Sequence, residues 1–275
     1  MNNDLLHLIR TLPPLPGLAR EILVAVTRED ADFGSMAEKI AREPVIAARV
    51  VGIANSAFSR ALPPALSIEG AIIRLGLNRV RMLALSVMLA EQFDSGRCPG
   101  FQGEHYWYQA VGTANCATQL ARALPDLDLD AAYLGGLLHN IGLLLLAWAY
   151  PRQISQILSE QQATEPTRSL SSLLQAHLGT DHHAAGQQLL TDWGLPAEII
   201  AATTVGADVA AEDQPTPLVQ VIRYSAQWTA ADYQQLPTDS LPGLAPTQLR
   251  IIAESCRGSR EQLLEFARLL AHPYI

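Results

Sequence analysis

Lysine is almost absent from this chain of 275 residues, in which Lys39 is the only example. Arginine supplies the rest of the positive charge, the formal net charge is −8, and 17% of the residues are charged. Non-specific nucleic-acid binding depends on many cations that neutralise phosphates. The composition therefore argues against a nucleic-acid partner. Hydrophobic residues make up 49% of the chain, which is enough to form a large buried core and argues against disorder.

Cysteine pairs and the common catalytic motifs are missing as well. Cys98, Cys116 and Cys256 are widely separated and form no C-x-x-C motif, a usage that suits a reducing cytoplasm. The sequence has no G-x-x-x-x-G-K-[ST] phosphate loop, no G-x-S-x-G nucleophile elbow and no H-E-x-x-H zinc motif. Its first residues lack the apolar core of a signal peptide. We expect a cytoplasmic protein without a cofactor.

One apolar run, residues 134–149, raises the question of a membrane span. It is shorter than the ~20 residues that a spanning helix needs. His139, Asn140 and three glycines interrupt it. We expect a helix that is buried on all sides inside the protein, and no membrane contact.

Helical periodicity dominates, and sustained alternation of apolar and polar residues is missing. The sequence therefore predicts an all-α protein. Ser67 is placed to cap a helix that ends at Gly76, and Asp181 or Thr180 to cap a later one. The predicted helices are 15–29, 35–43, 44–58, 67–76, 78–93, 104–124, 129–150, 151–162, 166–178, 183–193, 215–232 and 246–271, with a polar break at 94–103.

Several segments, in this order, are similar to one family, that of the HDOD domains. They are LPPLPGLAREIL (12–23), EPVIAARVVGIANSAFS (43–59), IEGAIIRLGLNRVRMLAL (68–85), GGLLHNIGLLLL (135–146) and LGTDHHAAGQQLLTDWGLP (178–196). The resemblance implies an all-helical fold related to the HD phosphohydrolases and the HD-GYP cyclic-dinucleotide phosphodiesterases. It also implies a bacterial signalling module, since most HDOD proteins lack demonstrated hydrolase activity.

The resemblance also implies where a metal centre would lie. In catalytic HD relatives an early His, a His-Asp pair and a later Asp hold the metal. Here the early position falls near Gln109, the pair is His139-Asn140, and the later helix (219–230) contains no acid. A further segment, where related sequences can carry a His-His pair, reads Thr203-Thr204-Val205. These departures predict that no metal is held and that catalysis is lost.

The surviving histidines leave two interpretations open. His182 and His183 lie at the start of a predicted helix, where they are solvated or pack against the His139-Asn140 segment. Alternatively, one of them forms a two-ligand metal site with His139. We favour the structural interpretation, because a lone buried histidine is more often a hydrogen-bonded core residue than a ligand.

Two further groups are candidates for contact with a partner or ligand. Asn55 and Ser56 lie where a predicted helix ends, and either cap that end or form a polar notch for a partner. Arg74, Arg79 and Arg81 cluster in sequence around Gly76. They either form a solvated helix face, which we favour, or bind a phosphate or a carboxylate-rich partner.

The sequence thus predicts a multi-helix HD-like bundle with an amino-terminal helical part. We expect an HDOD domain over residues 1–205, with the amino-terminal part at about 1–93 and the HD-like part from about 104. A helical extension, 206–275, packs on the HD-like part. The leading hypothesis is a non-enzymatic module that contacts other signalling proteins. The alternatives are a metal-dependent phosphohydrolase with an atypical site around His139, Asn140 and His182, and a sensor that binds a nucleotide without cleaving it.

Overall fold

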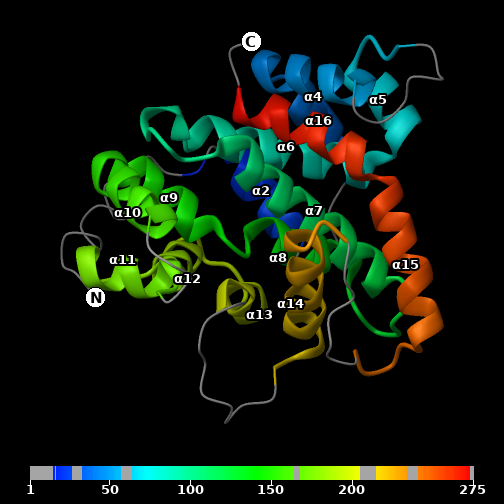
Figure 1. Ribbon diagram of the computed structural model, residues 1–275. Helices are drawn as coiled ribbons and strands as arrows, with labels where there is room; N and C mark the ends of the chain where they lie inside the picture. Colours follow the sequence, from blue (N-terminus) through cyan, green and yellow to red (C-terminus); the bar gives the residue numbers. More distant parts are fainter. Residues whose placement is uncertain are drawn as a thin grey trace.

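The computed structural model describes residue 15 and residues 17–26, 33–56, 64–163, 168–204, 215–233 and 241–272. Throughout these ranges the regular elements are α-helices and short 3-10 turns, and no strand occurs (Figure 1). The predicted all-α class and the HD-like multi-helix bundle are therefore confirmed.

The amino-terminal part consists of short helices whose ends follow local sequence signals. Ser67 caps α5 by accepting a hydrogen bond from the Gly70 amide, and Gly76 ends that helix with φ of 84°. A positive φ is available to glycine at little cost. Pro44 opens its helix at a position where the missing N–H is not needed. The helices are α2 (Gly17–Val26), α3 (Phe33–Ala41), α4 (Pro44–Ser56), α5 (Ile68–Leu75) and α6 (Leu77–Gln92).

The HD-like part follows a 3-10 turn at Ser95–Arg97 and is built around α7 (Gly103–Ala121). Glycines let its neighbours approach closely: a Cβ at Gly136 would lie 2.6 Å from the Ala114 Cα, and one at Gly112 would lie 2.6 Å from the Thr229 side chain. The remaining elements are α8 (Leu129–Leu138), α9 (Ile141–Ala149), α10 (Pro151–Ala163), α11 (Leu170–Leu178), α12 (His182–Asp192), α13 (Ala197–Ala201) and the 3-10 turn Ala202–Thr204.

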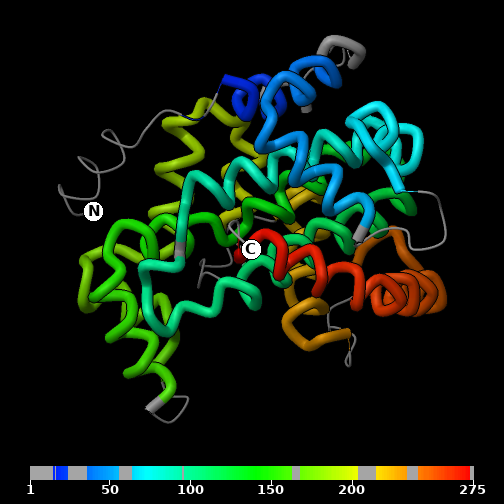
Figure 2. The backbone as a smooth tube through the Cα atoms, turned by 90° about the horizontal axis from the view of Figure 1, so that it is seen from above, coloured from blue at the N-terminus to red at the C-terminus, as the bar shows by residue number. Residues whose placement is uncertain are grey.

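The carboxy-terminal helices are α14 (Pro217–Ala230), α15 (Pro246–Gly258) and α16 (Arg260–Ala271), and all three contact α7. Helix α16 also packs on α4 and α6, and the Arg49 Nη2 donates to the Leu269 carbonyl oxygen at 2.7 Å (Figure 2). The tail therefore joins both other parts of the bundle. The predicted boundary at 205/206 lies outside the described residues.

Two predicted helices were wrong in the same way. Residues 129–150 form two helices, because Asn140 leaves the helical conformation with φ of −120° and ψ of 23°. Residues 246–271 also form two helices, which meet at Ser259. In both cases the apolar periodicity continues across the break, so the pattern alone predicts one helix.

The stretch Leu129–Ala149 is long and apolar enough to cross a membrane by length and composition. In the structure 67% of its apolar window is buried inside the protein. It is also interrupted at the junction of α8 and α9. A mostly buried core stretch of this kind is weak support for a membrane span.

Candidate functional site: a closed histidine cluster

The α8–α9 junction brings the predicted histidines together. His139 ends α8, Asn140 precedes α9, and the first turn of α12 supplies His182 and His183. Asp181 caps α12 by accepting a hydrogen bond from the Ala184 amide at 2.8 Å. Helices α9 and α12 contact each other directly. Residues about forty positions apart in sequence therefore form one cluster, which we call the histidine cluster: His139, Asn140, His182 and His183.

Two of the imidazoles are held by backbone carbonyls. The Nδ1 of His139 lies 2.7 Å from the Gly136 carbonyl oxygen, and that of His183 lies 2.6 Å from the Thr203 carbonyl oxygen. A carbonyl oxygen only accepts, so each Nδ1 carries the proton and donates it. In a neutral ring the Nε2 is then unprotonated.

Burial disfavours the charged form of two of these histidines, His139 and His182. It lowers the pKa of His139, and the neighbouring His183 adds to the effect. It lowers the pKa of His182 to about 4, again reinforced by His183, whose ring centroid is 4.0 Å away. A second positive charge in this space would be repelled and poorly solvated. The lowered pKa values therefore leave His139 and His182 uncharged near neutral pH.

Asn140 contributes a buried oxygen with no hydrogen-bond partner among the described residues, its side-chain Oδ1. It does not cap α9 with its side chain. An unsatisfied buried acceptor costs about 1–3 kcal/mol. An ionised carboxylate in the same position would lose more hydration and cost more.

The helices approach too closely at the cluster to leave room between them. A Cβ at Gly142 would lie 1.9 Å from the His182 carbonyl oxygen and 2.5 Å from the Gly186 amide nitrogen. Helix α9 therefore starts in direct backbone contact with the first turns of α12. The two cavities described below are lined by other residues.

The donor set does not fit a metal ion of the HD type. No group of three His, Cys, Asp or Glu side chains that could hold a metal occurs in the described part of the chain. Gln109, which stands near the early ligand position, donates from Nε2 to the Thr229 carbonyl oxygen of α14 at 3.4 Å. Divalent cations in such centres need carboxylates to offset their charge, and the histidine cluster has none.

The predicted partner-contact residues do not form one cluster. The side-chain amide of Asn55 forms two hydrogen bonds with the backbone of Ala65. Its Nδ2 donates to the Ala65 carbonyl oxygen at 2.9 Å, and its Oδ1 accepts from the Ala65 amide nitrogen at 2.8 Å. Arg74 Nη1 also donates to the Asn55 Oδ1, at 3.5 Å. The side chain of Ser56 lies outside the described residues. Asn55 therefore ties the end of α4 to the segment that precedes α5.

The expectation of a solvated helix face was wrong for Arg81. Its side chain is fully buried in α6 and forms an ion pair with Asp130 of α8. Burial raises the pKa of Asp130, and the Arg81 charge opposes that effect. Arg79 is exposed and lines a cavity that Asp130 also borders. Arg74 and Arg81 are thus committed to structural contacts, and Arg79 is the arginine of the three that borders a cavity.

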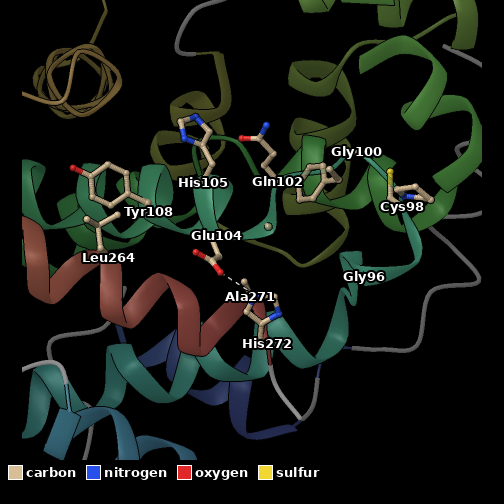
Figure 3. A pocket seen from close by; sticks show the side chains of 13 residues that line it. Gly96, Cys98, Gly100, Gln102, Glu104, His105, Tyr108, Leu264, Ala271 and His272 are labelled. Atoms are coloured by element: carbon tan, nitrogen blue, oxygen red, sulfur yellow. Dashed lines mark hydrogen bonds and ion pairs between the residues drawn. The ribbon is translucent and has the colours of Figure 1, made fainter. Parts of the chain in front are cut away.

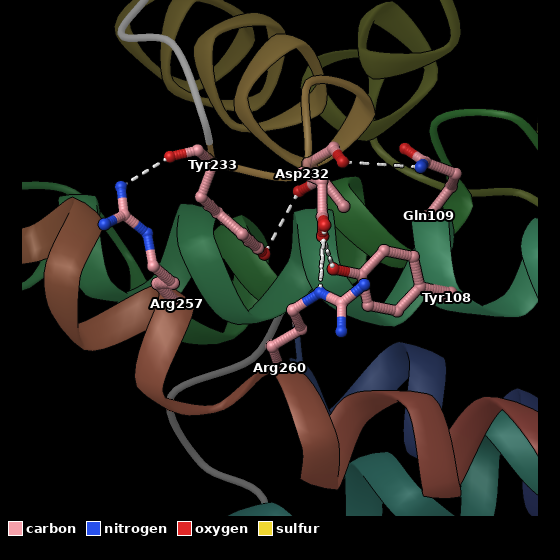
Figure 4. A network of polar contacts seen from close by, with 7 residues as sticks. Tyr108, Gln109, Asp232, Tyr233, Arg257 and Arg260 are labelled. Atoms are coloured by element: carbon pink, nitrogen blue, oxygen red, sulfur yellow. Dashed lines mark hydrogen bonds and ion pairs between the residues drawn. The ribbon is translucent and has the colours of Figure 1, made fainter.

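Sequence reasoning missed a polar network at the end of α14 (Figure 4). Asp232 accepts from the Tyr108 hydroxyl at 2.8 Å and from the Arg260 Nε at 2.8 Å, which joins α7 to the start of α16. The hydrogen bond from Arg260 is the main cause that lowers the pKa of Asp232. Asp232 and Tyr233 both have positive φ, at 49° and 58°. Tyr108 and Asp232 are more than a hundred residues apart, so no local signal indicates their contact.

A cavity of about 680 Å³ lies beside this network, between the start of α7 and the end of α16 (Figure 3). Glu104 crosses its edge to pair with His272 at 3.0 Å. Phe101, Leu264 and Ala271 supply apolar lining, and Cys98 and His105 also border it. The lining combines one acid and two histidines with apolar groups, and the acid is already paired with His272, so its chemistry indicates no ligand class.

Comparison with known proteins agrees with the all-helical HD-like fold. The HDOD domain profile matches residues 12–208. A crystal structure of a candidate phosphohydrolase from Shewanella amazonensis is 25% identical, with a TM-score of 0.74 over 98% of each chain. A second crystal structure, of a candidate signal transduction protein from Marinobacter aquaeolei, is 24% identical in sequence to this chain. Its TM-score is 0.80, and the match covers 98% of this chain and 65% of the Marinobacter chain.

A third crystal structure, of an HDOD domain protein of unknown function from Geobacter sulfurreducens, is 21% identical, with a TM-score of 0.75 over 99% of both chains. At that identity the likeness concerns the fold. An uncharacterized protein of Treponema pallidum is 25% identical in an alignment of 263 residues that covers 92% of this chain. The chain spans half the length of that curated relative.

Proposed function

The chain belongs to the HDOD domain family, and we propose that it is a non-catalytic bacterial signalling module that acts through contacts with other proteins. The chemistry of the histidine cluster is the observation that carries this proposal. The pKa values of His139 and His182 are lowered, two of its imidazoles donate to backbone carbonyls, and Asn140 stands where a carboxylate would be needed. Without a bound cation there is no group to lower the pKa of an attacking water.

The packing of the cluster supports the same proposal. A substrate phosphate and its metal ions require space above the ligands, whereas Gly142 brings the backbone of α9 against α12. A phosphohydrolase that used His139, Asn140 and His182 would have to open this contact. Backbone contacts of this kind stabilise a rigid junction and favour a structural role for the histidines.

The surface around α5 supports a role in binding other proteins. Leu66, just before α5, is 91% exposed, and Ile73 within it is 88% exposed. Single exposed apolar side chains are common, but two on one short segment indicate a contact surface. Asn55 and Arg74, both predicted contact residues, lie beside it. We propose that the contacts with cytoplasmic signalling proteins lie on this α5 surface, defined by Leu66 and Ile73.

Affinity capture from the native cell tests the role of the α5 surface. The wild-type chain should retain signalling proteins, and Ile73→Ser should lose them with an unchanged melting temperature, because the side chain is already solvated. Ile251→Ser is the matched control, since Ile251 is 66% exposed on α15, outside this surface. Equal capture by all three proteins, or no captured signalling protein, would count against the proposed surface.

A further inference from the structure

A second cavity lies where the three parts of the chain meet. Its volume is about 290 Å³, and we call it the junction pocket. Helices α7 and α15, which both contribute to its lining, pack against each other (Figure 1). Its lining comes from α6, α7, α8 and α15, so a ligand there would touch the amino-terminal part, the HD-like part and the tail at once. Its polar lining includes Asn78, Arg79, Asn115, Arg122, Asp130 and Ser255.

The junction pocket has an excess of positive charge in a protein whose net charge is −8. Arg79 of α6 and Arg122 at the end of α7 both line it. Asp130 is the one acid among the described residues of the lining, and its carboxylate is paired with the buried Arg81. Two guanidinium groups therefore border a space whose single acid is already compensated, which favours an anionic ligand.

The pocket also offers hydrogen-bond donors. The Asn115 Nδ2 is buried and has no acceptor among the described residues. A buried donor in this state costs about 1–3 kcal/mol, which a ligand oxygen would recover. Asn78 of α6, Gln119 of α7 and the Ser255 hydroxyl of α15 add further donors from three helices. Burial raises the pKa of Tyr133, also in the lining, to about 12, so its hydroxyl stays protonated.

We propose that the junction pocket binds a small organic phosphate of about mononucleotide size, held by Arg79, Arg122 and Asn115. Donors that converge from separate helices match the several oxygens of a tetrahedral phosphate better than a planar carboxylate. A cyclic dinucleotide, which contains two nucleotides, exceeds this volume. Binding would stabilise the arrangement of all three parts of the chain. A small ligand could therefore regulate the module. This inference holds whether or not the histidine cluster is catalytic.

Calorimetric titration and thermal melting of the full chain test the proposal, with AMP, GMP and citrate as probes. At least one mononucleotide should bind the wild type and raise its melting temperature. Arg122→Gln should weaken that binding about tenfold or more, since a charge-assisted contact is lost. Arg122 is exposed, so the ligand-free variant should melt as the wild type does. Arg250→Gln, at an exposed position of α15 outside the lining, is the control for a general change of charge.

Three results would overturn the proposal. The first is that no mononucleotide binds the wild type. The second is that Arg122→Gln binds as tightly as the wild type, or that Arg250→Gln weakens binding equally, which would place the anion elsewhere. The third is that citrate binds as tightly as the mononucleotides, which would show a site selective for charge alone.

Discussion

Gly142→Ala should lower the free energy of unfolding by at least about 3 kcal/mol, which is a fall of roughly 10 °C in melting temperature for a chain of this size. The added Cβ would lie 1.9 Å from the His182 carbonyl oxygen. Because that atom belongs to the backbone of α12, no side-chain rotation relieves the clash, and α9 and α12 must separate. Urea and thermal unfolding of the purified variant measure the effect.

Gly52→Ala is the matched control for this substitution. Gly52 lies within α4, and a Cβ there would meet nothing within 4 Å. Alanine at this position should stabilise the helix by about 0.5–1 kcal/mol through backbone entropy. A Gly142→Ala variant that melts together with Gly52→Ala would show that α9 and α12 are not in direct backbone contact, and the closed cluster would have to be abandoned.

Asn140→Asp should destabilise the protein by about 3 kcal/mol at pH 8 when a chelator is present. The amide oxygen at this position is buried and without a partner among the described residues, and the pKa values of the nearby His139 and His182 are lowered. A carboxylate there would lack both solvent and a cation. Its pKa in the folded protein would therefore lie above its value in the unfolded chain.

The pH dependence of this penalty has a definite sign. A raised folded pKa means that the native state holds the proton more tightly than the unfolded state does, so stability is lost as pH rises through that interval. The penalty should be full above the folded pKa and shrink as pH falls towards the unfolded value. The lowered pKa values of His139 and His182 destabilise both proteins as pH falls below the ordinary histidine value. The difference between variant and wild type thus isolates the titration of the introduced carboxyl group.

Melting curves of wild type, Asn140→Asp and Gln153→Glu between pH 5 and 8 measure this dependence. Gln153 is exposed in the first turn of α10, so its conversion to an acid should change little. If Asn140→Asp matches the wild type at every pH, position 140 is not a buried neutral site. If Mn²⁺ stabilises the wild type strongly, the cluster holds a metal after all.

Much of the fold could be predicted because its signals are local. Ser67 and Asp181 act as helix caps, as their positions in the sequence indicate. The break at Asn140 was missed because the segments before and after the His139-Asn140 pair are both apolar, so the helical pattern continues across it. The packing of α9 on α12 outweighs this periodicity. The Arg81–Asp130 pair joins residues far apart in sequence. Arginine side chains are mostly exposed, so only the tertiary structure shows that Arg81 is buried.

The candidate site was predictable in its chemistry and not in its geometry. The sequence shows that Gln109 and Asn140 stand where ligands are expected, and this already argues against a metal centre. It does not show that His183 donates to the Thr203 carbonyl, or that Gln109 turns towards α14. The contact of Tyr108 with Asp232 spans more than a hundred residues, which no spacing rule captures.

Hydrolysis of phosphodiesters by the purified chain of 275 residues tests the central claim most directly. Bis(p-nitrophenyl) phosphate and cyclic di-GMP would each be supplied with Mn²⁺, Mg²⁺, Ni²⁺ or Fe²⁺, and His139→Ala would be assayed in parallel. The histidine cluster has neither a carboxylate nor a described group of three metal ligands, so we expect both proteins to show only the background rate. Turnover by the wild type that disappears in His139→Ala would contradict the non-catalytic function proposed for this protein.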